Sequence, residues 1–200
     1  LGDRLLVVSA TRLSILADDG TEVYSQEVRF TDPALAVGGK TAVAYDVGGT
    51  ALYLLGEKGL VRDLSGETGN GVVSARLNSS DFLTLVTDKS GYKSSVSVYT
   101  ASGDRAFTFN SSNHYMLDAV CERDGKHVAV VTLGEDDGAF TSTVRRYALD
   151  QGTALSACTL DDTLLYEIGS LGSTTVAVTD RSFFALSADG SLKGLYDYAY

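Results

Sequence analysis

Leu186-Ser187-Ala188-Asp189-Gly190, in which an apolar strand end runs into a turn closed by glycine, is one of five copies of a pattern. The closing glycines are residues 20, 59, 103, 152 and 190, which places them 39, 44, 49 and 38 residues apart. A period between 20 and 50 residues indicates a repeated supersecondary unit. The other copies are Leu16-Ala17-Asp18-Asp19-Gly20, Leu55-Gly56-Glu57-Lys58-Gly59, Thr100-Ala101-Ser102-Gly103 and Ala148-Leu149-Asp150-Gln151-Gly152.

A second pattern precedes each of these turns and consists of a polar turn followed by an apolar strand. The two patterns keep the same order in all five units, so we interpret them as parts of one repeat. The copies are Gly2-Asp3-Arg4-Leu5-Leu6-Val7-Val8, Gly39-Lys40-Thr41-Ala42-Val43-Ala44-Tyr45, Ser80-Asp81-Phe82-Leu83-Thr84-Leu85-Val86, Gly125-Lys126-His127-Val128-Ala129-Val130-Val131 and Gly172-Ser173-Thr174-Thr175-Val176-Ala177-Val178.

Each unit contains four short segments with the composition of β-strands, rich in Val, Tyr, Phe, Thr and Leu and bounded by Gly, Asn, Asp and Ser. No window of 12 or more residues keeps a helical period, so we expect almost no helix. Four-stranded antiparallel units at this spacing predict an all-β fold, a β-propeller with about five blades. In the third unit the strands are predicted at residues 72–77, 82–87, 95–99 and 105–109.

The predicted blades occupy residues 1–30, 31–66, 67–110, 111–160 and 161–200 of a single domain, 1–200. A β-sandwich, a barrel and a β-solenoid are alternatives that also use many short strands. The first unit begins at its second strand, so the C-terminal segment 195–200 either completes that blade and closes a ring of five, or the blades belong to a larger propeller. An open arc would leave blade faces and strand edges exposed and would permit homo-oligomers.

Composition excludes several classes of partner. The 200 residues carry 16 Lys and Arg against 26 Asp and Glu, a net charge of -10, with no basic cluster in the sequence. Nucleic acid is therefore not a predicted partner, and neither is an anionic membrane surface. The cysteines, Cys121 and Cys158, are assigned to the first and fourth strands of the fourth unit. Two intervening strands would separate them by about 14 Å, so we predict two free thiols.

Several short motifs resemble a known bacterial family. They are Asp32-Pro33-Ala34-Leu35, Gly39-Lys40, Tyr45-Asp46-Val47-Gly48-Gly49-Thr50, Asp124-Gly125-Lys126 and Ser142-Thr143-Val144. With them the chain resembles, over essentially its whole length, the β-propeller family of unknown function DUF5711. The resemblance implies a bacterial protein that is anchored in the membrane by a segment outside this chain and carries its propeller outside the cytoplasm, at the cell surface. It implies no catalytic residue and no ligand.

In a propeller, the loops between the second and third strands and those between successive blades emerge on one face, where ligand sites are common. The longest predicted loop of this face is 134–141, and its neighbour is 88–94. Consecutive acids in the first lack the alternating spacing of a calcium loop, so we predict no metal site there. No cofactor motif occurs. The candidate ligand-binding residues are Lys89, Tyr92, Lys93, Asn113, His114, Asp136, Asp137 and Phe140.

No catalytic constellation is recognisable, and His114 with its neighbours shows no acid-base partner in the sequence. The favoured interpretation is a non-enzymatic binding or interaction module of a bacterial cell-envelope protein, with a protein or a cell-envelope glycan as its partner. The alternative is a glycan-active lyase or hydrolase with its site at the channel mouth, which would require converging carboxylates or a His-Tyr pair.

Overall fold

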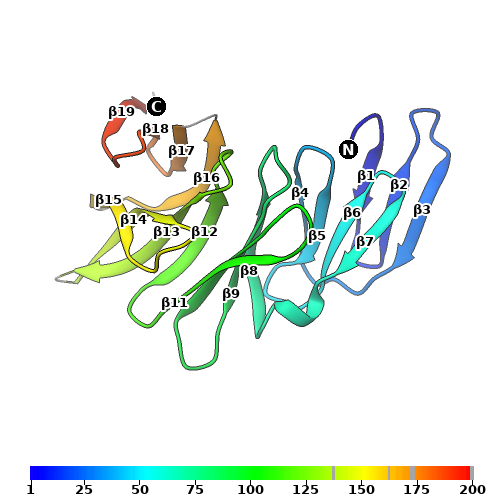
Figure 1. Ribbon diagram of the computed structural model, residues 1–200, viewed down its shortest axis with the longest axis horizontal. Helices are drawn as coiled ribbons and strands as arrows, with labels where there is room; N and C mark the ends of the chain where they lie inside the picture. The colour runs from blue at the N-terminus through cyan, green and yellow to red at the C-terminus, as the bar shows by residue number, and fades with distance from the viewer. Residues whose placement is uncertain (137, 162, 172–173, 199–200) are drawn as a thin grey trace.

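The computed structural model describes residues 1–136, 138–161, 163–171 and 174–198. These residues form five antiparallel sheets, here called blades 1 to 5, that follow one another around an arc (Figure 1). Blade 1 has three strands and the other four have four each, paired in chain order. Blade 1 contains β1 (Leu5–Val8), β2 (Arg12–Leu16) and β3 (Glu22–Glu27); blade 2 contains β4 (Pro33–Val37), β5 (Ala42–Asp46), β6 (Leu52–Gly56) and β7 (Gly59–Asp63).

The three C-terminal blades have longer strands. Blade 3 contains β8 (Gly71–Leu77), β9 (Leu83–Asp88), β10 (Ser94–Tyr99) and β11 (Arg105–Ser111). Blade 4 contains β12 (Tyr115–Cys121), β13 (His127–Asp136), β14 (Ala139–Ala148) and β15 (Ala154–Asp161). Blade 5 contains β16 (Leu165–Leu171), β17 (Thr174–Thr179), β18 (Ser182–Leu186) and β19 (Leu192–Asp197).

The predicted strands of the third unit are confirmed by β8 to β11, and blade 1 lacks a first strand as the repeat pattern indicates. Across the described residues the one helical element is a 3-10 turn, η1 (Ser65–Glu67). Within the same residues no helix is long and apolar enough to cross a membrane.

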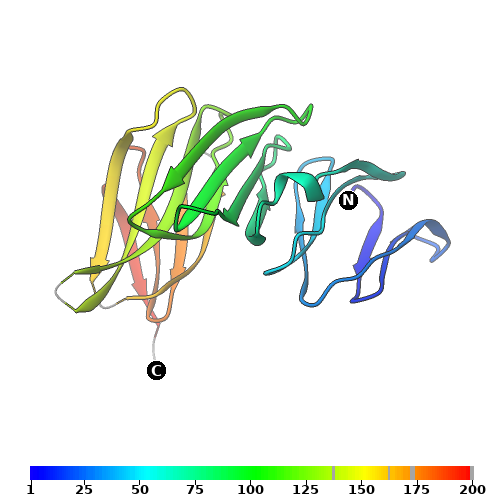
Figure 2. The same cartoon turned by 90° about the horizontal axis from the view of Figure 1, so that it is seen from below.

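The core is divided into four apolar layers, one at each junction between neighbouring blades. Strand β13 is apolar at every position from Val128 to Val131 because both faces of the strand are buried. Its side chains alternate between two faces, so Val128 and Val130 pack towards blade 3 while Ala129 and Val131 pack towards blade 5. Because both faces of the middle blades are covered, burial of apolar surface stabilises the stack of sheets, whose strands are shown from a second side in Figure 2.

The first strands of successive blades lie next to one another, with β12 packed between β8 and β16. A polar bridge joins these three strands. The Arg76 guanidinium on β8 donates to the buried carboxylate of Asp118 on β12 at 2.8 Å and to Glu167 on β16 at 2.7 Å. Each of the three strands also carries an irregularity in its pairing with the second strand of its blade.

The two ends of the arc remain apart. Strand β19 pairs with β18 and with no other described strand, so the C-terminal segment completes blade 5 instead of blade 1. In Figure 1 blade 1 and blade 5 lie at opposite ends of the molecule. Of the two arrangements that the sequence left open, the described residues adopt the open arc and not the closed ring of five.

Aspartates at the ends of second strands hold the loops between blades. The Asp46 carboxylate, at the end of β5, accepts hydrogen bonds from the backbone N–H groups of Thr31 and Asp32 at 2.6 and 2.7 Å. Asp180 likewise accepts from the N–H of Leu164 at 3.2 Å. These contacts tie the loop that enters a blade to the end of the second strand of that blade. The loops between blades and the loops between second and third strands therefore share one face of the arc, here called the loop face.

Candidate functional site

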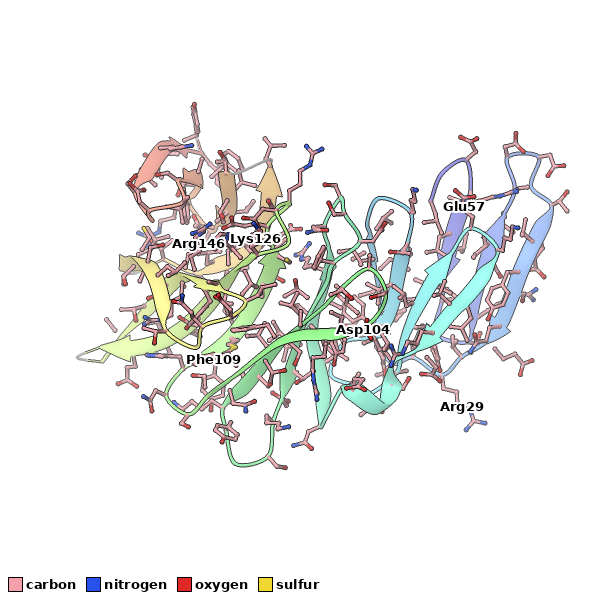
Figure 3. The ribbon with its side chains drawn as sticks, in the orientation of Figure 1. Arg29, Glu57, Asp104, Phe109, Lys126 and Arg146 are labelled. Atoms are coloured by element: carbon pink, nitrogen blue, oxygen red, sulfur yellow. The ribbon has the colours of Figure 1, made fainter. Side chains whose placement is uncertain are left out.

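A groove of about 460 Å³ lies between blades 3 and 4 and extends from the loop that follows β11, on the loop face, to the β14–β15 turn. One wall is the end of β11 with the loop that follows it, and the other is the face of β13 and β14 that looks towards blade 3. Phe109, at the blade 3 side of this junction, is labelled in Figure 3. We call this the Arg145 groove; its lining includes Asn113, His114, Thr132, Arg145, Tyr147 and Thr153.

Two aromatic side chains form the apolar part of the Arg145 groove. Tyr147 is buried on β14, and its ring centroid lies 5.0 Å from that of Phe109 on β11. Arg145 lies two residues before Tyr147 on the same strand, so both side chains point to the same face of the sheet. The arrangement places a guanidinium beside an aromatic pair.

Arg145 is half-buried, and its Nε atom is buried without a hydrogen-bond partner. Neither Arg145 nor Lys93 forms an ion pair with any residue that the structure describes. An unpartnered buried donor on a charged group costs free energy, which an anionic ligand that accepts from the guanidinium would recover.

His114 occupies the top of the groove because β13 has a glycine at the facing position. A Cβ atom on Gly134 would lie 3.0 Å from the Nδ1 atom of His114, closer than nearly all real contacts of that kind. The loop holding His114 is fixed by its own backbone, since the N–H of His114 donates to Ser111 Oγ at 3.0 Å. The glycine therefore makes room for the imidazole.

Lys93 approaches the same corner from the β9–β10 loop of blade 3. Its N–H donates to the carbonyl of Ser111 at 2.8 Å. Its Nζ atom stands 4.9 Å from the ring centroid of Tyr115, a cation–π contact. Lys93, His114 and Arg145 therefore bring two permanent positive charges and one imidazole to one corner of a chain whose net charge is -10.

The environment of this corner shifts the pKa of the His114 imidazole. Burial lowers the pKa of His114, and the nearby positive charges of Arg145 and Lys93 lower it further. His114 is therefore neutral at neutral pH, where it offers one ring N–H as a hydrogen-bond donor. The positive field of the corner has no negative side chain that neutralises it through an ion pair within the described residues.

The sequence-predicted residues are distributed around this corner unevenly. Asn113 and His114 line the Arg145 groove, and the charge of Lys93 acts on His114 from outside its lining. Tyr92 is exposed beside Lys93. Lys89 starts the same loop, where its carbonyl accepts from the N–H of Tyr92 at 3.0 Å. Their role as ligand contacts stays a prediction.

The predicted loop 134–141 is wrong, because strands β13 and β14 continue into it. Glu135 pairs with Phe140, and Asp136 with Ala139, so the segment is a projecting hairpin arm. Its polar residues are compatible with a strand because the backbone ladder needs no particular side chain. Gly138, with φ of 82°, sits in the tight turn. Phe140 is exposed on the arm, and Asp137 lies outside the described residues.

Sequence reasoning missed Arg145, the central residue of the groove. The available signal was the pair Arg145-Arg146 within an alternating strand, which must send one guanidinium to each face of the sheet. Arg146 binds both carboxylate oxygens of Glu122, at 2.6 and 3.0 Å. Only the structure reveals that Arg145 has no such partner among the residues it describes.

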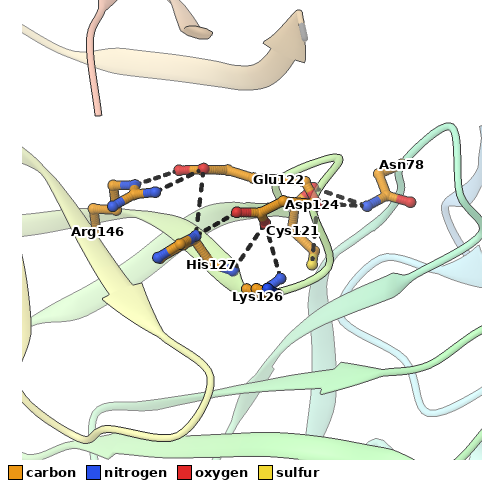
Figure 4. Close-up of polar contacts among 7 residues, drawn as sticks. All are labelled: Asn78, Cys121, Glu122, Asp124, Lys126, His127 and Arg146. Carbon is orange, nitrogen blue, oxygen red and sulfur yellow. Dashed lines mark hydrogen bonds and ion pairs between the residues drawn. The ribbon is translucent and has the colours of Figure 1, made fainter. Parts of the chain in front are cut away.

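A separate acidic cluster lies on the opposite face, at the β12–β13 turn (Figure 4). Glu122, Asp124 and His127 bring ligand-type atoms within 4.8 Å of one another. Each of these side chains already has a hydrogen-bond partner within the protein. The Asp124 carboxylate accepts from the N–H of Lys126 at 2.8 Å and lies 2.6 Å from His127 Nδ1. The Glu122 carboxylate accepts from Arg146. We interpret the cluster as a network that closes the turn.

The inner strands contain the carboxylates that the alternative enzymatic interpretation would require. Asp118 and Glu167 both contact the same guanidinium, that of Arg76. A glycosidase pair needs one carboxyl that stays protonated to act as an acid. Each of these two carboxylates is instead paired with the Arg76 guanidinium, so we assign the pair a structural role.

Sheets of four antiparallel strands, repeated around an arc with their first strands innermost, define a β-propeller. The chain belongs to the DUF5711 family, a family of unknown function, whose model matches residues 1–197. No curated protein sequence matches the chain.

Solved structures of similar fold include β-propellers. One is KlHsv2 with loop 6CD replaced by a Gly-Ser linker, with a TM-score of 0.72, 14% identity and coverage of 99% of this chain and 65% of that one. Another is the hydrazine synthase of Kuenenia stuttgartiensis, with a TM-score of 0.67, 11% identity and coverage of 96% and 62%. BamB from Moraxella catarrhalis has a TM-score of 0.55, 15% identity and coverage of 98% and 62%. The chain thus spans about two thirds or less of the length of these proteins, and at such identities the likeness shows the fold alone.

Proposed function

We propose that this propeller is a non-enzymatic binding module of a bacterial cell-envelope protein, exposed at the cell surface and tethered by an anchor outside this chain. It engages a protein or a cell-envelope glycan through the loop face at blades 3 and 4. Membership of a propeller family supports an interaction role, and the envelope location rests on the sequence resemblance.

The observation that carries the proposal is a set of exposed aromatic side chains at the loop-face ends of blades 3 and 4. Tyr92, Tyr115 and Phe140 are 45%, 53% and 68% exposed. Tyr115 pairs with Leu133 of β13 and Phe140 pairs with Glu135 of the same strand. These two aromatic residues therefore lie opposite positions that are only two residues apart on β13. Aromatic residues next to a basic side chain are typical of binding hot spots. Exposing these aromatic side chains to solvent does not stabilise the fold.

The test is binding of the purified chain to two preparations, cell-envelope polysaccharide freed of protein and solubilised envelope protein freed of glycan. The test variant is Tyr92→Ser with Phe140→Ser. The matched control is Val23→Ser with Val61→Ser, which removes two exposed apolar side chains from β3 and β7, far from the groove. We expect the test variant to lose at least tenfold in affinity for one preparation and the control to bind as the unmodified chain does.

Equal binding by the two variants would contradict the loop face as the binding surface. Absence of saturable binding to either preparation by the unmodified chain would contradict the proposed function itself. Release of shortened or unsaturated sugar products from the polysaccharide would instead favour the lyase or hydrolase.

A further inference from the structure

We propose that the Arg145 groove is a binding site for an acidic sugar, with Arg145 and His114 holding its carboxylate. The inference rests on the proposed function and narrows the partner to a glycan that carries carboxylate groups. It is drawn from the side chains of the groove, which present three features that one such residue would use together.

The first feature is the cationic end of the groove. The Arg145 guanidinium is planar and presents its N–H donors as a fork that matches the two oxygens of a carboxylate. Its Nε–H is buried and has no partner in the structure. The neutral His114 adds a further donor, and Lys93 adds charge without a competing ion pair among the described residues.

The second feature is the polar lining beside the cation. Hydroxyl and amide side chains from both walls line the groove. They come from Ser111 and Asn113 on one side and from Thr132 and Thr153 on the other. Groups of this kind both donate and accept hydrogen bonds, as the hydroxyls of a sugar ring require.

The third feature is the apolar surface and the size. The partly buried ring of Phe109, in contact with Tyr147, offers a face for the C–H side of a sugar ring. A volume of about 460 Å³ falls in the range of small-molecule sites. A carboxylate at one end, hydroxyls along the walls and an apolar floor together fit a uronic acid better than a bare anion.

The chain provides its own reporter for this site, because it contains only two histidines. His114 lies in the groove, and His127 lies on the opposite face, bound to Asp124. A bound carboxylate next to His114 stabilises the imidazolium and raises the pKa of His114, and His127 on the opposite face serves as the internal reference. Proton NMR of the two imidazoles follows both groups in one titration.

The experiment titrates the folded chain with sodium glucuronate, with glucose, acetate and phosphate as separate comparisons at the same ionic strength. We expect glucuronate to raise the pKa of His114 saturably, and the three comparison ligands to bind at least tenfold more weakly. Arg145→Met, which keeps an unbranched apolar stem, is expected to weaken glucuronate binding at least tenfold. Lys58→Met removes an exposed charge from the β6–β7 turn of blade 2, outside the groove, and is expected to change binding less than twofold.

Three results would overturn the proposal: acetate binding as tightly as glucuronate, phosphate binding more tightly, or glucuronate leaving His114 unchanged while the unmodified chain is folded. Thermal unfolding of Arg145→Met shows whether that variant retains the fold, and the His114 titration of the unmodified chain decides the matter if it does not. Envelope binding without any glucuronate effect would refute this inference alone, because the proposed function would still hold.

Discussion

Replacing Asp118 by asparagine removes one negative charge from the bridge that joins blades 3, 4 and 5. The Asp118 carboxylate is only 3% exposed. It accepts from the Nε and Nη2 atoms of Arg76, from the N–H of Ala119 at 2.9 Å and from the N–H of Ile168 at 3.2 Å. Asparagine keeps the shape of the side chain, but it turns one acceptor into a donor and leaves Arg76 without its buried partner.

The size of the effect follows from these contacts. Loss of one partner of a buried ion pair costs about 3–5 kcal/mol. Arg76 is 31% exposed and keeps its contact with Glu167, so the lower end applies and we expect Asp118→Asn to lower the free energy of unfolding by about 3 kcal/mol. For a chain of 200 residues this corresponds to a drop in thermal midpoint of roughly 6–12 °C.

The assay is thermal unfolding followed by circular dichroism, with urea unfolding as a second measure. The matched control is Glu167→Gln, because Glu167 contacts the same guanidinium but is 56% exposed. An exposed ion pair contributes less than about 1 kcal/mol. If both variants lost the same stability, or if Asp118→Asn lost less than Glu167→Gln, the bridge would not derive its strength from burial and this reasoning would be refuted.

Two further predictions concern stability and reactivity. Burial disfavours the charged form of Asp81, but hydrogen bonds from the N–H of Lys40 and from Thr41 outweigh this and lower the pKa of Asp81. Because the folded pKa lies below the unfolded value, the stabilisation is present above about pH 4 and is lost as the pH falls through the folded pKa. The loss of stability in Asp81→Asn, about 1–2 kcal/mol at pH 7, should therefore shrink below pH 3.8, and a difference independent of pH would contradict it. Burial raises the pKa of Cys121 to about 12 and raises that of the half-buried Cys158 as well, so a thiol reagent at pH 8 should label Cys158 slowly and Cys121 only after denaturation. Mass spectrometry measures the labelling of each thiol. Rapid labelling of both thiols in the folded chain would show that blade 4 is packed less tightly than in the structure.

Blade 4 shows which structural features local sequence patterns predict and which they do not. The run from His127 to Val131 predicted a strand, and the structure contains β13 there. The two cysteines were predicted free from their strand assignments, and both thiols are free. These predictions succeeded because strand formation and strand order depend on alternation and turns within one repeat. The extent of the same hairpin was mispredicted, because the pairing of Glu135 with Phe140 is carried by the backbone, which polar side chains do not reveal.

The sequence by itself determined the repeat, the strand content and the membership of a propeller family. Tertiary structure alone decided that β19 completes blade 5, leaving the arc open among the described residues. It alone also placed His114 and Arg145 in one groove, with the charge of Lys93 acting on His114. Turn and strand patterns act over neighbouring residues, whereas the contacts of a blade junction join positions more than 20 residues apart. Those contacts depend on which face of each sheet meets the next and on a glycine at position 134 that leaves room for an imidazole.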